Sequence, residues 1–282
     1  MSHIVIDHIE TSLKAALKET DFTQLAVLVD ENTRAHCYPL VQAFLPEHLL
    51  IQITSGEENK NLRTCEHIWE QFTSNNFDRK ALLINLGGGV IGDMGGFCAV
   101  TYKRGIRFIN IPTTLLAAVD ANVGGKLGID FMGFKNHLGF FQDPETVLID
   151  PIFLKTLVPR ELRSGFAEVI KHGLIADADY FEQTTAHGLD IENWEAVIAH
   201  SVEIKNEVVK TDPKEAGLRK ILINIAKEDF SGIIKLMYQD KKNLNNLLNH
   251  SLLMDIGKAT YDIAVDEKDV IDSLFYFTKL KH

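Results

Sequence analysis

The stretch ALLINLGGGVIGDMGG, residues 81–96, joins an apolar run to a cluster of glycines. Its first six residues are typical of a buried β-strand, and the residues after the glycines are typical of a helix. Glycines at such a turn let backbone N–H groups approach a pyrophosphate, and the helix start adds positive partial charge. The same glycines would also serve a tight turn with close helix–sheet packing. The strand before and the helix after favour the nucleotide, so the stretch predicts a dinucleotide site.

Apolar runs of the same kind occur on both sides of this stretch. Residues 25–29, 49–53 and 107–111 are short and rich in aliphatic side chains, and amphipathic stretches such as 62–72 separate them. Short apolar strands that lack strict alternation and are separated by helices are typical of a parallel sheet covered on both faces. The first half of the chain is therefore predicted to be a doubly wound, mostly parallel α/β domain.

The pattern changes near Asp150-Pro151, a dipeptide that is also a helix-entry signal. Helical periodicity without any convincing β-run marks three later stretches, residues 154–174, 196–209 and 230–237. A chain of 282 residues is long enough for two domains. We therefore expect an α/β domain over residues 1–150 and an all-helical domain over residues 151–282.

Composition excludes several classes of function. The net charge of -10 disfavours a nucleic-acid partner, and no apolar run is long enough to span a membrane. Cys37, Cys65 and Cys98 are scattered without a CxxC spacing, which favours a reducing compartment over a disulfide framework. The chain reaches Asp7 before an apolar segment forms, so no signal peptide is expected. These features predict a soluble, cytoplasmic protein.

A second polar cluster follows the predicted strand at 107–111. It comprises PTTLLAAVD at 112–120, Gly124-Gly125-Lys126 and Gly133-Phe134-Lys135-Asn136. Lysine supplies a point charge for phosphate and glycine permits close approach, so the cluster is typical of a pocket for an oxygen-rich, phosphorylated ligand. For either lysine taken singly, a position in a solvated loop is the better interpretation.

A third motif is GFAEVIKHG, residues 165–173, in which Glu168 and Lys171 share one face of the expected helix. An ion pair is the commoner outcome of that spacing. The alternative is a carboxylate that binds a divalent metal beside an ammonium that holds substrate. Further basic positions occur at Lys205, Arg219 and DKKN, residues 240–243, where solvated helix surfaces are the default interpretation.

Taken together, these motifs resemble the 3-dehydroquinate synthase family. The segments that carry the resemblance are GGGVIGD (87–93), PTTLLA (112–117), GGK (124–126), KN (135–136) and AEVIK (167–171). The likeness runs from about residue 25 to 219 and returns from about 230 to 267. The resemblance implies an NAD-binding α/β domain followed by a helical domain for metal and substrate, which agrees with the pattern of elements above.

The activity that this resemblance implies is that of a lyase in the shikimate pathway, on the route to chorismate and the aromatic amino acids. Such an enzyme converts 3-deoxy-D-arabino-heptulosonate 7-phosphate to 3-dehydroquinate and phosphate. NAD takes a hydride and later returns it, phosphate is eliminated in between, and an intramolecular aldol step closes the ring. A divalent metal, zinc or else cobalt, polarises the hydroxyl that is oxidised.

The resemblance also implies the residues of the site. Those expected to bind NAD are Asp30, Asn32, Glu57, Lys60, Gly88, Gly89, Val90, Ile91, Gly92, Asp93, Thr113, Thr114, Lys126, Lys135, Phe153, Leu154, Lys155 and Thr156. Those expected to act on the substrate are Asp120, Lys126, Asn136, Lys171, Lys205, Arg219 and either Lys241 or Lys242. Arg104 is expected to reach the phosphate site of a neighbouring subunit, which implies a homodimer, and Glu168 is expected to bind the metal.

The chain departs from the family after Arg219. There the family pattern continues as Asn-Phe-Gly-His-Thr-x-Gly-His-Ala and later His-Gly-Glu, which supply two metal-ligand histidines, whereas residues 219–227 here read RKILINIAK. Of three expected ligands only Glu168 is present, and a catalytic zinc generally needs three. Either the protein contains a further segment between about Leu222 and Ile225, or that segment is truly lost. The presence of Lys171 and Lys205, and the return of family-like sequence afterwards, favour the first explanation. An intact mass of 31.7 kDa would contradict it.

Three alternative functions stay open on the sequence. They are another sugar-phosphate cyclase, a metal-dependent polyol dehydrogenase of the same architecture, and a metal-less NAD-binding protein if the histidine segment is truly lost. Lys126, Lys135-Asn136 and Arg104 favour a phosphorylated substrate, and Lys205 and Arg219 favour one that also carries a carboxylate. A small phosphorylated carboxylate sugar is therefore the expected substrate.

Overall fold

The structure, a computed structural model, describes residues 3–211, 248–255, 258–265 and 268. It divides into two compact units, Met1–Ile170 with His187–Lys205 and Lys171–Ala186 with Asn206–His282. The predicted domain boundary between residues 150 and 151 falls inside the first unit and stays a prediction. Among the helices of the described ranges, none is both long and apolar enough to cross a membrane.

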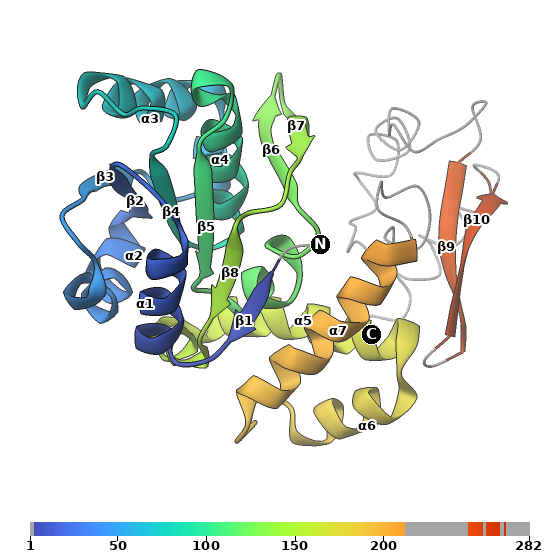
Figure 1. Cartoon of the computed structure of the whole chain (residues 1–282). Helices are drawn as coiled ribbons and strands as arrows, with labels where there is room; N and C mark the ends of the chain where they lie inside the picture. The colour runs from blue at the N-terminus through green and yellow to red at the C-terminus, as the bar shows by residue number, and fades with distance from the viewer. Residues whose placement is uncertain (1–2, 212–247, 256–257, 266–267, 269–282) are drawn as a thin grey trace. The chain divides into compact units, whose positions relative to one another are not determined.

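A six-stranded sheet organises the first unit, and every neighbouring pair of its strands is parallel (Figure 1). The strands pair in the order β1-β8-β5-β4-β2-β3, with bounds β1 Ile4–Ile6, β2 Leu25–Asp30, β3 Leu49–Ile53, β4 Leu82–Gly87, β5 Arg107–Pro112 and β8 Thr146–Ile149. Strands β2 to β5 lie where apolar runs predicted them, so the prediction of a mostly parallel α/β fold is confirmed. Strands β1 and β8 were not predicted, because three or four residues show no clear period.

Both faces of this sheet are buried. In β2, Ala26 and Leu28 belong to one apolar cluster with residues of α3 and α4, whereas Leu25, Val27 and Val29 belong to another with α1. Successive side chains of a strand point to opposite faces, so burial on both faces explains why β2 is apolar throughout. The helices of this part are α1 Ile9–Glu19, α2 Glu31–His36, α3 Leu62–Ser74 and α4 Gly89–Thr101.

A row of three buried asparagines runs beneath α4. Asn85 of β4 donates from Nδ2 to Oδ1 of Asn110 on β5 at 2.9 Å, and Asn110 donates in turn to Oδ1 of Asn122 at 2.9 Å. The helix approaches this row through two glycines. A Cβ atom on Gly92 would lie 2.2 Å from Asn122 Oδ1, and one on Gly95 would lie 1.9 Å from Asn85 Oδ1. The glycines of α4 therefore serve close packing as well as the turn.

Gly95→Ala is expected to lower the free energy of unfolding by about 2 kcal/mol, because the added methyl overpacks a buried site. Urea unfolding of the purified variant measures this change. The double variant Gly95→Ala/Asn85→Ala removes the amide that the methyl meets, so part of the loss should be recovered. Purely additive effects of the two substitutions would show that the close approach is not the cause.

An antiparallel hairpin, β6 Lys126–Phe131 with β7 Phe134–Phe141, stands apart from the parallel sheet (Figure 1). Its two turn residues, Met132 and Gly133, have φ of 52° and 82°, the left-handed values that a two-residue type I′ turn requires. These strands were not predicted from the sequence, because lysines close to glycines are typical of a polar loop. The hairpin carries three predicted site residues, Lys126, Lys135 and Asn136.

Residues 151–211, which were predicted to begin the helical domain, are mainly helical. A π-helix η5 (Ala117–Ala121) precedes them, and they contain α5 Pro159–Ala176, α6 Ala178–His187 and α7 Trp194–Thr211. Short 3-10 helices are η1 Tyr38–Leu40, η2 Gln42–Phe44, η3 Glu57–Asn59, η4 Tyr102–Arg104 and η6 Pro151–Thr156. The expectation that no strand would occur in this half was wrong, since β9 Leu248–Asp255 and β10 Lys258–Val265 pair antiparallel. The helix predicted at 230–237 lies outside the described residues.

Candidate active site

The glycine turn lies between the carboxyl end of β4 and the start of α4, as predicted. Gly88 has extended backbone, Gly89 begins the helix, and in the described chain no side chain caps this helix end. A Cβ atom on Gly88 would lie 3.2 Å from Thr114, and one on Gly89 would lie 3.2 Å from Ala121. Because these glycines have no side chains, the segments that follow β4 and β5 can approach each other closely. The first N–H groups of α4, which have no acceptor within the helix, lie at this approach.

Most residues predicted to bind NAD follow the carboxyl ends of adjacent parallel strands. Asp30 ends β2, Thr113 follows β5 and donates its N–H to Gly87 O at 3.1 Å, and η6 follows β8. Ligands of open parallel sheets bind at this edge. Two members of the set, Phe153 and Leu154, have buried side chains. Any contact that they make with NAD would therefore come from their backbone.

Three residues from separate stretches meet at one buried ammonium group. Lys60 Nζ lies 2.6 Å from Asp93 Oδ2 on α4 and 2.6 Å from Asn136 Oδ1 on β7. Burial raises the pKa of Asp93 to about 6, although the charges of Lys60 and Lys126 oppose the rise. A second, more exposed pair joins Lys135 Nζ to Glu57 Oε1 at 3.2 Å. Predicted cofactor and substrate residues thus form one continuous polar cluster.

The pH dependence of stability is expected to carry a contribution from Asp93. Its pKa is higher in the folded chain than the ordinary 3.8, so the folded state holds the proton more tightly than the unfolded state. That contribution to stability is present at low pH and is lost as the pH rises from about 4 to about 6. Relative to Asp93→Asn, the wild-type protein should lose on the order of 3 kcal/mol across this window. Urea unfolding of both proteins at several pH values measures the difference, and a constant difference would contradict the prediction.

A second cluster surrounds Asp120 of η5. Lys205 of α7, only 6% exposed, forms an ion pair with this carboxylate. Glu168 of α5 offers a carboxylate oxygen within 4.8 Å of that of Asp120. Helix α5 can approach η5 because a Cβ atom on Gly165 would lie 2.5 Å from Leu116 N. Glycine at position 165 therefore places Glu168 beside Asp120.

Comparison with known proteins identifies the family of the chain. The family model described as 3-dehydroquinate synthase N-terminal matches residues 50–164, and the one described as 3-dehydroquinate synthase C-terminal matches residues 165–225. A 3-dehydroquinate synthase of Parabacteroides distasonis is 32% identical, with 97% of each chain covered. The chain belongs to the 3-dehydroquinate synthase family.

Other members of the 3-dehydroquinate synthase family match over less of their length. The one from Sulfurovum sp. is 47% identical over 73% of this chain and 60% of its own, and the one from Campylobacter concisus is 49% identical over 62% and 51%. The chain thus spans between half and three fifths of these relatives. The alignment with the Parabacteroides protein covers 342 positions, 60 more than the chain has residues. The Parabacteroides protein therefore contains residues, within the aligned region, that this chain lacks.

Two solved structures share the fold of this chain. The 2-epi-5-epi-valiolone synthase of Streptomyces hygroscopicus subsp. jinggangensis 5008, solved with NAD+ and Zn2+, superposes with a TM-score of 0.81 at 21% identity, covering 100% of this chain and 98% of its own. A 2-deoxy-scyllo-inosose synthase complexed with carbaglucose-6-phosphate, NAD+ and Co2+ gives 0.68 at 24% identity, covering 85% and 69%. At these identities the likeness shows the fold.

The structure does not bring every predicted residue of this family's site together. Arg104 is exposed at the end of η4, and Asn32 is exposed on α2. Lys171 belongs to the second unit. Arg219, Lys241, Lys242 and the expected break near 222–225 lie outside the described residues. Their roles stay predictions.

Sequence reasoning missed two features of this site. Asp130 accepts a hydrogen bond from the backbone N–H of Asn136 at 2.7 Å, and only the unpredicted hairpin explains why these residues meet. His172 follows Glu168 by one turn of α5 and so offers an imidazole on the same face. The spacing of four residues within AEVIKH was the available signal for His172.

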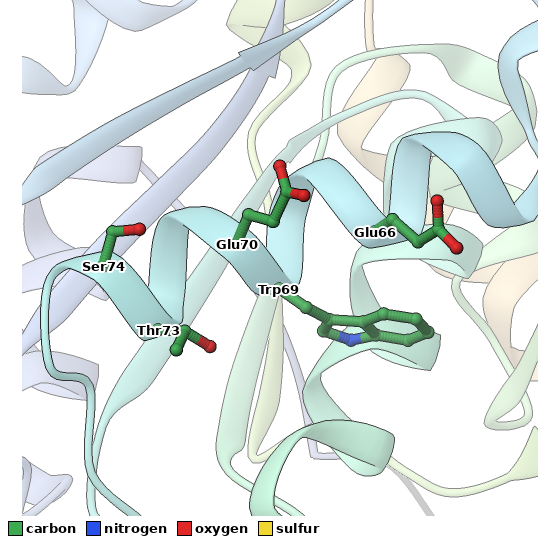
Figure 2. A pocket seen from close by; sticks show the side chains of 5 residues that line it. All are labelled: Glu66, Trp69, Glu70, Thr73 and Ser74. Atoms are coloured by element: carbon green, nitrogen blue, oxygen red, sulfur yellow. The ribbon is translucent and has the colours of Figure 1, made fainter.

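A pocket of about 370 Å³ lies away from these residues, on the outer face of α3. Figure 2 shows the five side chains that line it, Glu66, Trp69, Glu70, Thr73 and Ser74, all from this helix. None of them was predicted for the 3-dehydroquinate synthase site. The pocket therefore has no part in the function proposed below.

Proposed function

We propose that this chain catalyses the 3-dehydroquinate synthase reaction. Its substrate would be 3-deoxy-D-arabino-heptulosonate 7-phosphate, and its products 3-dehydroquinate and phosphate, with NAD recycled and no net oxidation. One observation carries the proposal: Asp120, Glu168 and Lys205, assigned by resemblance to substrate and metal, come from distant stretches and lie together. An ammonium and two carboxylates in a partly buried cluster match a site for a divalent metal and an anionic substrate.

The residues present fit NAD. Gly88 and Gly89 leave room for a pyrophosphate at the start of α4, where a side chain would meet Thr114 or Ala121. Asp30, at the end of β2, is placed for a ribose hydroxyl, although its Oδ1 also accepts from Thr33 N at 2.7 Å. NAD bound here would supply a hydride acceptor and donor.

The residues present also offer donors for a divalent metal. Glu168 and Asp120 are carboxylates within 4.8 Å of each other, and carboxylate oxygens are ligands that zinc and cobalt accept. The two histidines of the family pattern are absent from the 282-residue sequence. A metal held by these groups would polarise the substrate hydroxyl that is oxidised.

The chain's own side chains would bind and orient the substrate. The ammonium groups of Lys126 and Lys205 match a substrate that carries a phosphate and a carboxylate, and their charge stabilises the phosphate as it departs. Lys205 also holds the carboxylate of Asp120 in place through their ion pair. The proton removed during elimination would pass to the phosphate of the substrate itself, so no further general base is required of the protein.

A phosphate-release assay tests the proposal. Purified protein receives the heptulosonate phosphate and a catalytic amount of NAD, with and without a chelator. We expect phosphate release that needs NAD and stops with the chelator. Stoichiometric NADH would instead indicate a polyol dehydrogenase, and turnover of another sugar phosphate only would indicate another cyclase. Either result would overturn the proposal.

A metal-less NAD-binding protein is the second candidate, favoured by the absent histidines. It predicts NAD binding in a dialysis experiment, no cobalt binding and no phosphate release. Intact mass spectrometry addresses its premise. A mass above 31.7 kDa would show a further segment and contradict this candidate, whereas a mass of 31.7 kDa would support it.

We further propose a cytoplasmic homodimer in which Arg104 reaches the partner's phosphate site. Its exposure at the end of η4 and the three buried free cysteines support these two assignments. Light scattering coupled to gel filtration should give twice the mass of one chain. A monomer that releases phosphate at full rate would contradict the role of Arg104.

A further inference from the structure

Lys60 is a buried lysine whose ammonium connects two parts of the site. It is 3% exposed and follows η3 in the loop after β3. An ammonium group can donate three hydrogen bonds and accept none, and here it donates to Asp93 Oδ2 and Asn136 Oδ1, each at 2.6 Å. The resemblance assigns Lys60 to direct contact with NAD. That contact stays a prediction, and in the structure the ammonium bonds to a carboxylate assigned to the cofactor and to an amide assigned to the substrate.

The backbone of Lys60 contacts the same hairpin. Its carbonyl accepts from Asp130 N at 2.8 Å, and Asp130 Oδ1 accepts from Asn136 N at 2.7 Å. Asn136 has φ of 50°, a left-handed conformation that L-residues adopt only where their surroundings support it. Side-chain and backbone contacts of Lys60 therefore close a ring of hydrogen bonds that fixes this asparagine.

A buried ion pair can be a purely structural contact, so the pair with Asp93 alone assigns no role to Lys60. Lys60 differs because its second partner, Asn136, is neutral and sits on an exposed strand of the hairpin, where burial does not demand a partner. Asp93 accepts only one of the three hydrogen bonds that the ammonium can donate, and Asn136 accepts a second. The additional bond acts on the position of Asn136.

We propose that Lys60 is a positioning residue: its ammonium holds Asn136 at a fixed distance from Asp93 and so sets the spacing between substrate and cofactor. The role of the two partners rests on the proposed function. Lys60 need not touch either ligand.

Hydrogen exchange in the protein with NAD bound tests this role. In Lys60→Met, which keeps most of the aliphatic stem, the amides of Asp130 and Asn136 should exchange about tenfold faster, because the ring that protects them is opened. The KM for the heptulosonate phosphate should rise at least about tenfold. Lys14→Met is the matched control, since Lys14 pairs with Glu10 on an exposed helix face and should change neither quantity.

A double variant separates positioning from simple charge balance. Lys60→Met/Asp93→Asn removes both charges, so stability should recover relative to Lys60→Met, but the two hairpin amides should still exchange fast. Unchanged exchange in Lys60→Met, or slow exchange restored in the double variant, would overturn the proposal. Wild-type protein that shows the expected exchange but releases no phosphate would overturn the proposed function and leave the placement of Asn136 by Lys60 standing.

Discussion

Glu168→Gln is expected to lower kcat/KM for phosphate release on the order of 10³-fold. Glutamine keeps the size of the side chain but removes the negative charge, which is the property a divalent cation requires of this ligand. Several kcal/mol of transition-state stabilisation by the metal would be lost, and each 1.36 kcal/mol corresponds to tenfold in rate. Phosphate release under saturating NAD measures the effect, and cobalt absorption spectra measure metal binding independently of activity.

Glu161→Gln is the matched control on the same helix. Glu161 lies in the first turn of α5 and is exposed, so the same chemical change there should leave rate and cobalt spectrum unaltered. Loss of activity in Glu168→Gln with full cobalt binding would assign the metal to other residues. Equal activity of the two variants would contradict a catalytic role for Glu168.

Lys205→Met is expected to lower the free energy of unfolding by about 3 kcal/mol and to raise KM about 100-fold. The side chain of Asp120 is 24% exposed and would keep its charge in a partly desolvated place after losing this ammonium. Substrate binding loses the cation as well, and truncation of one charged group in a buried pair typically weakens binding by this amount. Urea unfolding and initial-rate kinetics measure the two effects.

Two variants show whether the loss comes from the buried pair. Lys210→Met changes an exposed lysine of α7 that pairs with Glu207, and its effect on stability should stay below about 0.5 kcal/mol. Lys205→Met/Asp120→Asn removes both charges, so stability should be regained while activity stays low. A double variant as unstable as Lys205→Met would place the cause in lost packing.

The parallel sheet was predictable because burial on both faces makes its strands mostly apolar, as in β2, where only the last residue, Asp30, is polar. The hairpin β6–β7 was not predictable in the same way. Its first strand, KLGIDF at 126–131, does alternate, but glycines inside and around it are typical of a loop. Its turn uses Met132 in a left-handed conformation that few residue types favour. In the β9–β10 pair, β9 shows no clear period of two, whereas β10, KATYDIAV at 258–265, does alternate and carried a signal for a strand.

The resemblance predicted which residues belong to the site, but it did not predict which of them contact one another. The resemblance named Lys60, Asp93 and Asn136, yet it placed the first two at the cofactor and the third at the substrate. Only the register of the hairpin brings Asn136 to the ammonium of Lys60. In the same way, the proximity of Asp120 and Glu168 depends on Gly165, whose close approach to Leu116 no local pattern reveals.

The position of β1 has a consequence for synthesis on the ribosome. This edge strand is synthesised before the other strands of the sheet, but Ile4 pairs with Val147, about 140 residues later. At a translation rate of about 5–20 residues per second, Ile4-Val5-Ile6 waits roughly 7–30 s for β8. A nascent chain therefore carries a short, unpaired apolar segment while its nucleotide-binding half is synthesised. Until that segment pairs with β8, the edge of β8 is open to pairing with another chain.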